Sequence, residues 1–524
     1  CTGCGTVCEL DNASESCASG SCALTSCETG YGNCDGVESN GCETLLVGNL
    51  NHCNACNNTC SYTNATASCS SNGCVLQSCK NNYVDLNNND ADGCECKITN
   101  SNDLPDDNFV DSNCDGIDGD ASNAIFVSPN GNDGWSGKKA YPVKTITKGI
   151  SLANAAGKDV YVAAGTYAYT STIVLKNGVS IYGGYNKTNW SRNDSNTVTI
   201  DVSHRVAMNG SNLSSPTVLD RLKIIGGDAP NSSTTAYRSA YGVKVSTSNG
   251  LRINNCDIES GDGYAGTDGT SNSGTAKHGG SGSKGGKGCE DSGGFCASCS
   301  KPKGGAGGTN SSCTSANGGK GGDAAKGSST GSAGSSSIGG TSGGSGVPKG
   351  KGNWNPTSSH VGKDGADGAN GSNGAGCSHG YNSSGYNPSN ATNGGYGSAG
   401  KGGGGGGGGG GGTSGCNSYG GGGGGGGAGG CGGKPGYKGT NGGGSFAVYL
   451  WNSNAQITYS VLRTGNAGKG GNGGGRQLGG NGGFYGVSSG NKGNDWGGSN
   501  EQDDGSNGGR GGLGGDGGNG GFGG

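Results

Sequence analysis

The feature that most constrains this chain of 524 residues is the uneven distribution of its 127 glycines. Residues 1–260 contain 26 of them, whereas residues 261–524 contain 101, with uninterrupted runs at Gly402–Gly412 and Gly420–Gly427. Glycine has no side chain to bury, and hydrophobic residues make up only 28% of the whole sequence. Apolar burial therefore cannot order the second half of the chain. Either another kind of interaction orders it, or it is disordered.

A period of three residues favours order. The segment GGRGGLGGDGGNGGFGG, residues 508–524, places a side chain at every third position only. A polyproline-II-like helix has three residues per turn and no internal hydrogen bonds, so its two bare glycine edges can bond to neighbouring helices. Only 10 prolines occur in the chain, which excludes collagen. We therefore predict polyglycine-II bundles in this half; a flexible Gly/Ser-rich linker is the alternative.

Cysteines near the beginning of the chain form a duplication with an offset of 52 residues. Seven cysteines recur in register without a gap, and the phrase NGCE at residues 40–43 returns as DGCE at residues 92–95. Each unit is small and poor in large apolar residues, so disulfides must replace a core, although spacing alone does not fix their pairing. The predicted disulfide framework consists of Cys1, Cys4, Cys8, Cys17, Cys22, Cys27 and Cys42, and of their equivalents Cys53, Cys56, Cys60, Cys69, Cys74, Cys79 and Cys94.

Zinc is the alternative use of these cysteines. Cys1 with Cys4, and Cys53 with Cys56, are CxxC pairs, but a second CxxC at zinc-ribbon spacing is missing. Cys34 has no equivalent, because Leu86 stands at that place in the second repeat. Disulfides fit the pattern better than zinc.

The cysteine content and the charge indicate where the chain works. Of 25 cysteines, 17 lie in residues 1–114, and such a density is typical of oxidising compartments outside the cytosol. The net charge of −4 gives no electrostatic basis for binding nucleic acid or an anionic membrane. No run of about 18 apolar residues exists, so we expect no transmembrane segment. We expect a secreted protein, either extracellular or at the cell surface.

Residues 103–122 form an acidic joint. Asp111, Asn113 and Asp115, followed by Gly116, match the beginning of a D-x-N-x-D-G calcium loop, which supplies oxygen ligands at alternate positions around a glycine turn. Asp118 and Asp120 can complete the set of ligands. Ser122 stands where an EF-hand has its closing glutamate, so the pattern predicts structural calcium rather than an EF-hand switch. A solvated acidic linker is the alternative.

The character of the sequence changes after the joint, where short β-branched segments alternate with turns of Gly, Asn, Ser and Asp. Equivalent segments recur every 20–25 residues or so, a spacing typical of one coil of a parallel β-helix. The predicted strands are Ile125–Val127, Val160–Val162, Ile173–Leu175, Val179–Ile181, Val198–Val202, Leu222–Ile225, Val243–Val245 and Leu251–Ile253.

A short helix is predicted within PVKTITKGISLANAAGK, residues 142–158, ahead of the regular coils. Val143, Ile146, Ile150 and Ala153 lie on one face of such a helix. We expect that face to cover the open apolar end of the β-helix.

This region resembles a known family. The stretches IFVSPNGNDGWSGKKAYPVKTITKGISLA, KDVYVAAGTY and NGVSIYGGYN resemble the opening coils of pectate-lyase-like right-handed β-helices. The cysteine repeats and the DSNCDGIDGD joint resemble those of large secreted bacterial surface proteins that carry such helices. The resemblance covers about residues 1–260. It implies an all-β right-handed parallel β-helix and an extracellular address, but no activity, since lyases, adhesins and passive stalks share this fold.

One coil recurs inside the glycine-rich half. FAVYLWNSNAQITYSVLRTG, residues 446–465, is similar to YGVKVSTSNGLRINNCDIESG, residues 241–261. The alignment matches Val243 with Val448, Val245 with Leu450, and Ile258 with Leu462. The glycine-rich residues before and after this coil are therefore expected to be excursions from one β-helix. We expect the cysteines of this half to cross-link loops or helix ends of the first excursion: Cys289, Cys296, Cys299, Cys313, Cys377, Cys416 and Cys431.

Together these patterns divide the chain into seven segments. Two are cysteine-rich repeats, one is the joint, two belong to the β-helix and two are polyglycine-II excursions. In chain order they are residues 1–52, 53–102, 103–122, 123–261, 262–443, 444–465 and 466–524.

The function expected from this organisation is structural or adhesive, at the cell surface. Bare backbone groups at the end of a glycine bundle or of a β-helix form a template for another copy, so we expect self-assembly, as a disulfide-stabilised filament or appendage. The other expected partners are surface glycans. We expect no catalytic residues, and no cofactor apart from calcium.

Two alternatives remain. A polysaccharide-binding or polysaccharide-lyase protein would use charged residues near the coil strands, but no dense acidic cluster accompanies them. An ice-binding protein would need a flat, regular Thr or Ala ladder, and none is visible along the coils. The charged residues near the coil strands are Asp220, Arg221, Lys223, Arg252 and Asp257.

Overall fold

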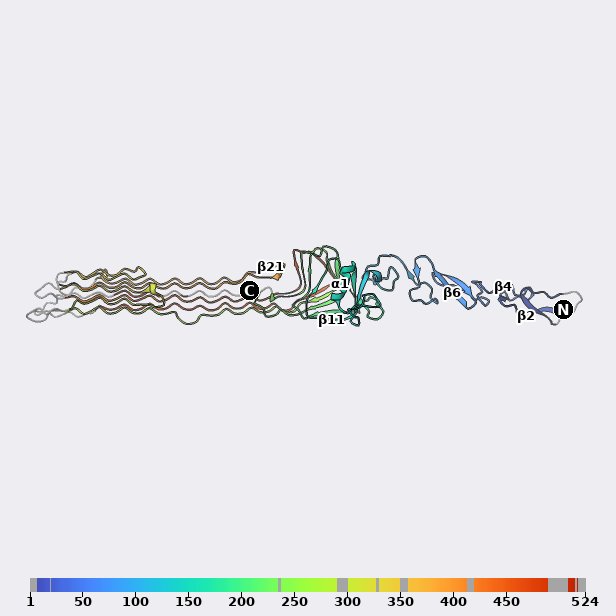
Figure 1. The fold of residues 1–524 in the computed structure, drawn as a ribbon, viewed down its shortest axis with the longest axis horizontal. Coiled ribbons are helices and arrows are strands. Elements are labelled where there is room, and N and C mark those ends of the chain that lie inside the picture. The colour runs from blue at the N-terminus through green and yellow to red at the C-terminus, as the bar shows by residue number, and fades with distance from the viewer. Residues whose placement is uncertain are drawn as a thin grey trace, which may run out of the picture.

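The protein is elongated in a computed structural model (Figure 1). The cysteine-rich repeats extend from one side of a strand-rich middle region, and long glycine-rich segments run out from the other side. The structure describes residues 7–18, 20–233, 237–289, 300–326, 329–348, 357–411, 419–488, 508–513 and 516. No helix in these ranges has the length and apolarity needed to cross a membrane.

The cysteine-rich region consists of small antiparallel hairpins. In the first long hairpin Cys17 lies opposite Cys22, and in the second Cys69 lies opposite Cys74, with a register shift at the same place in both. The hairpins are β1 (Ala13–Ala18) with β2 (Ser21–Cys27), β3 (Tyr31–Gly32) with β4 (Thr44–Leu45), β5 (Ala65–Ser70) with β6 (Gly73–Cys79), and β7 (Tyr83–Val84) with β8 (Cys96–Lys97); η1 (Glu38–Asn40) and η2 (Ala121–Asn123) are single 3₁₀ turns.

The middle region contains three parallel sheets. The six-stranded sheet has the order β24 (Ala455–Thr458), β19 (Leu251–Asn254), β16 (Thr217–Asp220), β13 (Ile181–Tyr185), β10 (Asp159–Ala163) and β9 (Ala124–Val127). The five-stranded sheet has the order β11 (Gly165–Tyr169), β14 (Val198–Val202), β17 (Leu222–Gly226), β20 (Asp257–Glu259) and β25 (Val461–Arg463). The four-stranded sheet has the order β12 (Ile173–Val174), β15 (Val206–Ser211), β18 (Ala240–Ser246) and β23 (Ser445–Trp451).

The chain visits these three sheets in rotation. From β10 onwards, successive strands belong to the six-, five- and four-stranded sheets in turn, so each circuit adds one strand to every sheet. Inward-facing Val, Ile and Leu side chains from all three sheets form one continuous buried cluster. The prediction of a mostly β chain with parallel sheets and little helix is confirmed.

The single α-helix of the described residues closes the first circuit. Helix α1 (Ile146–Ala156) begins after Thr145, whose hydroxyl caps the N–H of Lys148, and it ends at the left-handed Gly157. Ile146, Ile150 and Ala153 are buried in the core cluster, as the spacing predicts. Val143 is buried as well, but it precedes the helix and pairs with Val127.

Most predicted strands coincide with observed ones, with one error and four omissions. The strand predicted at Val179–Ile181 begins only at Ile181, because the chain turns just before that residue. Four strands of the three sheets were not predicted: β11, β15, β16 and β20. β11 and β15 present Tyr167, Ala207 and Met208 to the core rather than β-branched residues, and β16 and β20 are only 4 and 3 residues long, so no alternating run stands out.

The last circuit has the register that the internal sequence similarity predicts. Val243 pairs with Val448, Val245 with Leu450, and Ile258 with Leu462. β20 and β23 are separated by 185 residues of sequence, yet they belong to adjacent positions on the circuit. The described residues between them run out of the circuit and return to it.

The glycine-rich residues form extended segments that bond to one another rather than internally. Along residues 263–285, N–H groups at steps of mostly three residues donate to carbonyls of residues 466–487. The segment 402–411 bonds to six other segments. One bond to each is Gly406 N–H to Gly424 O, Gly322 N–H to Gly406 O, Gly405 N–H to Ser335 O, Gly344 N–H to Gly405 O, Gly404 N–H to Lys363 O, and Gly509 N–H to Gly404 O.

The segment 419–430 is likewise bonded to six neighbours. Representative bonds are Gly425 N–H to Ser283 O, Gly305 N–H to Gly423 O, Gly423 N–H to Gly322 O, Gly406 N–H to Gly424 O, Gly483 N–H to Ala428 O, and Gly427 N–H to Gly509 O. A Cβ at most of the described glycines of these two segments would collide with a neighbour's backbone carbonyl. The two longest glycine runs thus lie where the chain is surrounded on all sides.

Shorter elements complete this half. They are the 3₁₀ turn η4 (Thr314–Ala316) and the hairpin of β21 (Tyr381–Asn382) with β22 (Gly385–Tyr386). Cys313 is disulfide-bonded to Cys431, and Cys289 is also in a disulfide. The expectation that every cysteine here lies at a loop or segment end is wrong for Cys431, which lies midway along an extended segment and is 8% exposed. Cys377 is a free thiol, and Cys296, Cys299 and Cys416 lie outside the described residues.

Candidate functional site

The acidic joint folds around its own carboxylates. Asp111 accepts hydrogen bonds from the N–H groups of Asp115 and Gly116, and the side chain of Asn113 accepts one from Asp115 N–H. The Asn113 amide in turn donates to the Asp115 carboxylate at 3.1 Å. Three of the five predicted calcium ligands are therefore close together, in a tight turn with left-handed backbone at Gly116.

Asp103 is a further carboxylate of this joint that the sequence analysis missed. It is 3% exposed and accepts hydrogen bonds from the N–H groups of Ser112 and Gly119, each at 3.1 Å. Burial raises the pKa of Asp103, and the negative charges of Asp111 and Asp115 raise it further. Burial likewise raises the pKa of Asp115. No spacing rule relates Asp103 to the D-x-N-x-D-G pattern, so the pattern could not have identified it.

Asp118 has a different partner from the one predicted. Its carboxylate lies 2.8 Å from Nη1 of Arg192, and both side chains are essentially inaccessible to solvent. Arg192 also pairs with Asp220 and donates to the carbonyls of Gly183 and Asp106. Burial raises the pKa of Asp118, and the guanidinium opposes this rise without cancelling it.

Asp120 has a local role. It caps η2 by accepting hydrogen bonds from the N–H groups of Ser122 and Asn123. Its own N–H donates to the Tyr161 hydroxyl, and the Tyr185 hydroxyl donates to the Asp118 carbonyl at 2.7 Å. The joint is thus docked on an aromatic cluster of the first circuits and is not a solvated linker.

A shallow hollow of about 400 Å³ lies on the outside of the middle circuits. Arg221 on its wall is bonded to Asp194 at 2.7 Å and to Asp107 and Asp220 at 3.0 Å each. Burial works to lower the pKa of Arg221, but these carboxylates outweigh it and raise the pKa. Three carboxylates therefore hold the guanidinium of Arg221 in place on this wall. The rest of the lining comprises Asn196, Thr197, Val198, Leu222, Lys223, Asn255, Asp257 and Tyr459.

Three of the five charged residues considered for a lyase line this hollow, namely Arg221, Lys223 and Asp257, and the last two are register partners on neighbouring strands. Asp257 pairs with Arg463 of the following circuit, and Arg252 is exposed on a different sheet. Asp220 is engaged by both Arg192 and Arg221. The described lining of this hollow is therefore largely polar, and its Arg221, Asp194 and Asp257 side chains are held in ion pairs.

The cysteine repeats form a disulfide array with the same pairing in both units. Cys8–Cys22 recurs as Cys60–Cys74, and Cys27–Cys42 recurs as Cys79–Cys94. Cys53 is bonded to Cys69, and Cys17, the equivalent of Cys69, is also in a disulfide. Cys1 and Cys4 lie outside the described residues. The predicted use of these cysteines as disulfides is confirmed for the residues described.

Two bonds extend the array beyond a single repeat. Cys34, which has no equivalent in the second repeat, is bonded to Cys56 and joins the two units. Cys96 is bonded to Cys114 and joins the second unit to the joint. The whole cysteine-rich region is thereby cross-linked from one unit to the next.

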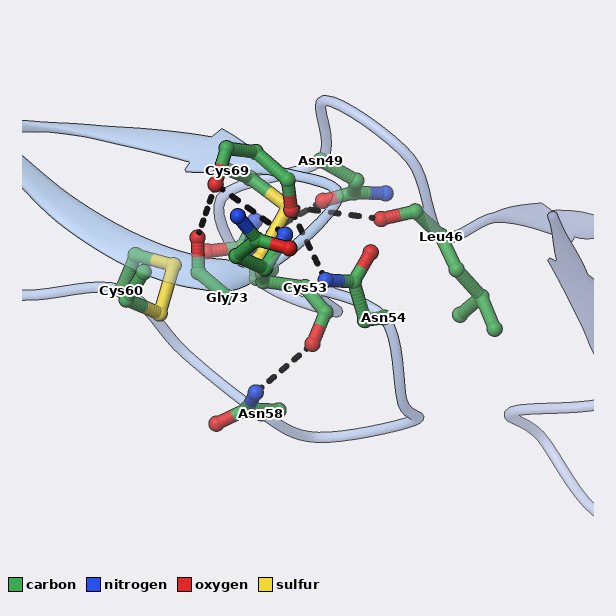
Figure 2. The surroundings of a disulfide bond; sticks show 12 residues. Leu46, Asn49, Cys53, Asn54, Asn58, Cys60, Cys69 and Gly73 are labelled. Atoms are coloured by element: carbon green, nitrogen blue, oxygen red, sulfur yellow. Dashed lines mark hydrogen bonds between the residues drawn. A yellow bond between two sulfur atoms is a disulfide. The ribbon is translucent and has the colours of Figure 1, made fainter.

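These bonds decide against zinc. The sulfurs of Cys53, Cys60 and Cys74 lie within 4.8 Å of one another, but all three are in disulfides, and a bonded sulfur is not a thiolate ligand. Figure 2 shows the Cys53–Cys69 bond with Cys60 nearby, and the Asn58 amide donates to the Cys53 carbonyl at 2.6 Å. With no apolar core here, such side-chain-to-backbone bonds and the sulfur bridges hold the turns.

One known protein family matches part of the chain. Residues 129–285 match a family described as "Protein of unknown function (DUF1565)", which is associated with parallel β-helix proteins. The matched residues begin before α1 and extend past β20 into the first glycine-rich segment. No curated protein and no solved structure is significantly similar to the chain.

Proposed function

We propose that the protein is an extracellular structural and adhesive component of a cell surface, built as a rigid, self-associating rod. Its disulfides support an address outside the reducing cytosol. Its elongated form has different architectures at the two ends (Figure 1). Such a form suits a molecule that projects from a surface or spans a distance rather than one that encloses a substrate.

The three sheets visited in rotation support a parallel β-helix, and the usual hand of parallel crossovers makes it right-handed. The glycine-rich segments support a polyglycine-II bundle, because their bonds recur about every three residues and connect different segments. In this proposal the β-helix is the platform from which the bundle extends.

The observation that carries the proposal is the six-fold bonding of the segment 402–411. A backbone bonded to six neighbours, with no room for a Cβ, resists bending more than a linker can. A glycine-rich tether needs neither property. The bundle therefore serves to hold a distance or to present a surface.

Fractionation and microscopy test this function. We expect the protein outside the cell or on its surface, with the bonds Cys34–Cys56 and Cys313–Cys431 present by mass spectrometry without reduction. Electron microscopy of the purified chain should show straight rods. Reduced thiols in a cytosolic fraction, or flexible particles without a straight arm, would contradict the proposal.

We further propose that calcium binds the joint through Asp111, Asn113 and Asp115, with Asp103 as an additional carboxylate. Oxygen donors are what calcium requires, and Asp111, Asn113 and Asp115 already lie together in one hydrogen-bonded turn. In the described residues the carboxylate oxygens of Asp103, Asp111 and Asp115 are not gathered within 4.8 Å of one another, so binding would draw them closer together. Asp118 and Asp120 are left out because they hold Arg192 and cap η2. Calcium would fix the angle between the cysteine-rich region and the β-helix.

Binding of a polysaccharide is a second candidate, favoured by the hollow around Arg221. Its lining combines exposed hydroxyl, amide and carboxylate groups with Tyr459, which is 84% exposed. Exposed aromatic and polar groups suit a sugar chain. Glycan-array binding that is lost in Tyr459→Ala, and kept in Tyr396→Ala on a different exposed tyrosine, would support it; no binding by the wild type would exclude it.

A further inference from the structure

The glycine-rich region meets the three sheets at two separate places. The first consists of chain connections: glycine-rich segments follow β20, precede β23 and follow β25, and they bond to one another at once, as Gly443 N–H does to Tyr264 O. Neither of the segments 357–380 and 387–411 adjoins a strand of the three sheets in sequence. They are joined to each other by the hairpin of β21 and β22, which lies at the end of the glycine-rich region nearest the sheets (Figure 1).

Hydrogen bonds give the order of the segments beside the sheets. In order across the region, the bonded stretches are 264–270 with 437–443, 433–436 with 394–397, and 389–398 with 369–378. The chain connections therefore lie on one side of this array, and the hairpin lies on the other.

The hairpin is docked on β18 and β23 of the four-stranded sheet. The N–H of Tyr386 donates to the Tyr241 hydroxyl at 2.8 Å, and the Tyr449 hydroxyl donates to the carbonyl of Asn382 at 2.8 Å. A third bond, of 3.2 Å, runs from the ammonium group of Lys244 to a carbonyl of the hairpin turn. Both strands of the hairpin and its turn are thus held by the sheet.

Aromatic rings pack in the same contact. Tyr241 stacks on Phe446 with ring centroids 5.4 Å apart, and the ring of Tyr386 lies 6.0 Å from that of Phe446. Tyr241 is fully buried, and Tyr449 and Tyr386 are 6% and 8% exposed. A buried tyrosine hydroxyl normally has a hydrogen-bond partner, and the hairpin backbone is a partner for two of them.

The hairpin depends on this contact for its order. β21 and β22 have two residues each, and an isolated two-stranded hairpin is at best marginally stable in water. Gly385 shows how closely the two parts fit. Its φ is +123°, and a Cβ there would collide with the Tyr241 hydroxyl, so the position requires glycine for two reasons.

We propose that this hairpin is a clasp that fixes the angle between the glycine-rich region and the sheets. The inference rests on the proposed rigid rod and specifies what makes its junction rigid. Parts of a chain that are joined on one side only usually move relative to each other, unless a large apolar contact prevents it. The connections hold one side of the glycine-rich region and the docked hairpin holds the other, so the arm cannot pivot about its connections.

Gly385→Ala tests the clasp, because its methyl group displaces the hairpin from Tyr241. Amides of residues 381–387 should exchange with deuterium at least about tenfold faster, since two buried hydrogen bonds are lost. Electron microscopy should show a spread of angles between arm and sheets where the wild type shows one angle. Gly340→Ala is the matched control: Gly340 also has a positive φ, +81°, in a turn of the same region, but a Cβ there meets nothing within 4 Å. It should change neither readout.

Tyr449→Phe keeps the test valid if Gly385→Ala fails to fold. It removes only the hydroxyl that bonds to Asn382, and it should speed the exchange of residues 381–387 by about three- to tenfold. Fast exchange of these residues in the wild type would overturn the inference. Unchanged exchange in both variants would do so too, as would a single angle in a variant whose hairpin has been released. Each of these results leaves the surface location and the straight wild-type rod, which are tested separately, in place.

Discussion

The three-sheet region and the glycine-rich region both stack extended backbone on extended backbone, but they use side chains in opposite ways. In the sheets each strand bonds to the circuit before and the circuit after, and alternate side chains fill a shared interior. In the glycine-rich region the central segments bond to six neighbours and leave no interior at all.

The difference follows from the residue period. A period of two directs all backbone bonds into the plane of a sheet and leaves two faces for side chains. A period of three directs the bonds outward in three directions, so that a fully surrounded segment has no face left. Val, Ile and Leu therefore stabilise the first region, whereas any Cβ is excluded from the centre of the second.

The energetic consequences also differ. Ordering one residue costs about 1–2 kcal/mol, and a net backbone hydrogen bond contributes only about 0.5–1.5 kcal/mol. The sheets add the burial of apolar side chains to this balance. The glycine-rich region has almost none to add, so we expect it to depend on cross-links and on its attachment to the last two circuits.

The largest effect should come from removing the cross-link of the glycine-rich region. The bond between Cys313 and Cys431 closes a loop with a sequence separation of 118, and a loop of that length corresponds to about 4–5 kcal/mol. Cys313→Ser combined with Cys431→Ser should lower the unfolding free energy of residues 300–444 by that amount, as measured by hydrogen exchange. The sheets should keep their protection.

Cys377→Ser is the control, because Cys377 is a free thiol in the same region. It should change protection very little. Equal protection in the double variant and the wild type would mean that backbone bonding alone holds the bundle, and that the two regions are less different than we argue.

A smaller effect is expected from truncating one side chain in the shared interior of the sheets. Ile258→Ala removes a fully buried side chain and should destabilise the sheets by about 3 kcal/mol in urea unfolding. Leu462→Ala removes its register partner in the following circuit, which is 45% exposed, and should cost less than about 1 kcal/mol. Equal costs would mean that Leu462 is buried as completely as Ile258.

The register between circuits was easier to predict from the sequence than the individual strands were. The match of Val243, Val245 and Ile258 with the last circuit fixed the register across a long glycine-rich excursion, because inward β-branched and Leu positions must align to share one interior. β16 and β20 were missed, since strands held by neighbours on both sides need little propensity of their own.

The candidate calcium site was less predictable. The local D-x-N-x-D-G pattern identified Asp111, Asn113 and Asp115, but Asp118 is used by Arg192, a residue 74 positions away in sequence. Asp103 enters the joint through backbone N–H groups that the fold brings to it. Such long-range partners leave no spacing signal in the chain.

A third prediction concerns glycine itself. A Cβ on Gly405 would collide with the backbone carbonyl of Lys320, whereas a Cβ on Gly475 meets only the Ser271 side chain, at 3.5 Å or more. Gly405→Ala should therefore cost about 1–3 kcal/mol of local stability, as overpacking does. Gly475→Ala should be neutral or slightly stabilising. Hydrogen exchange of the neighbouring amides distinguishes the two, and an equal response would contradict the surrounded position of Gly405.

The smallest effect should be the response of the joint to pH, and its direction should depend on calcium. Burial raises the pKa of Asp103 and Asp115 above the ordinary value of 3.8, so the folded joint binds protons more tightly than the unfolded chain does. Without divalent cations, the penalty for folding these carboxylates is fully present above the raised pKa values. It disappears as the pH falls through them, so mild acidification should slow hydrogen exchange of residues 99–123.

With calcium bound, the same acidification should have the opposite effect, because protons compete with the cation for the carboxylates. Exchange of residues 99–123 between about pH 7 and about pH 5, corrected for the intrinsic rate and compared in calcium and in EGTA, measures both signs. Asp115→Asn should abolish the calcium response, whereas Asp90→Asn, on an exposed turn of the cysteine-rich region, should not. Identical pH responses in calcium and EGTA would mean that the joint holds no cation, and that hydrogen bonds alone make it rigid.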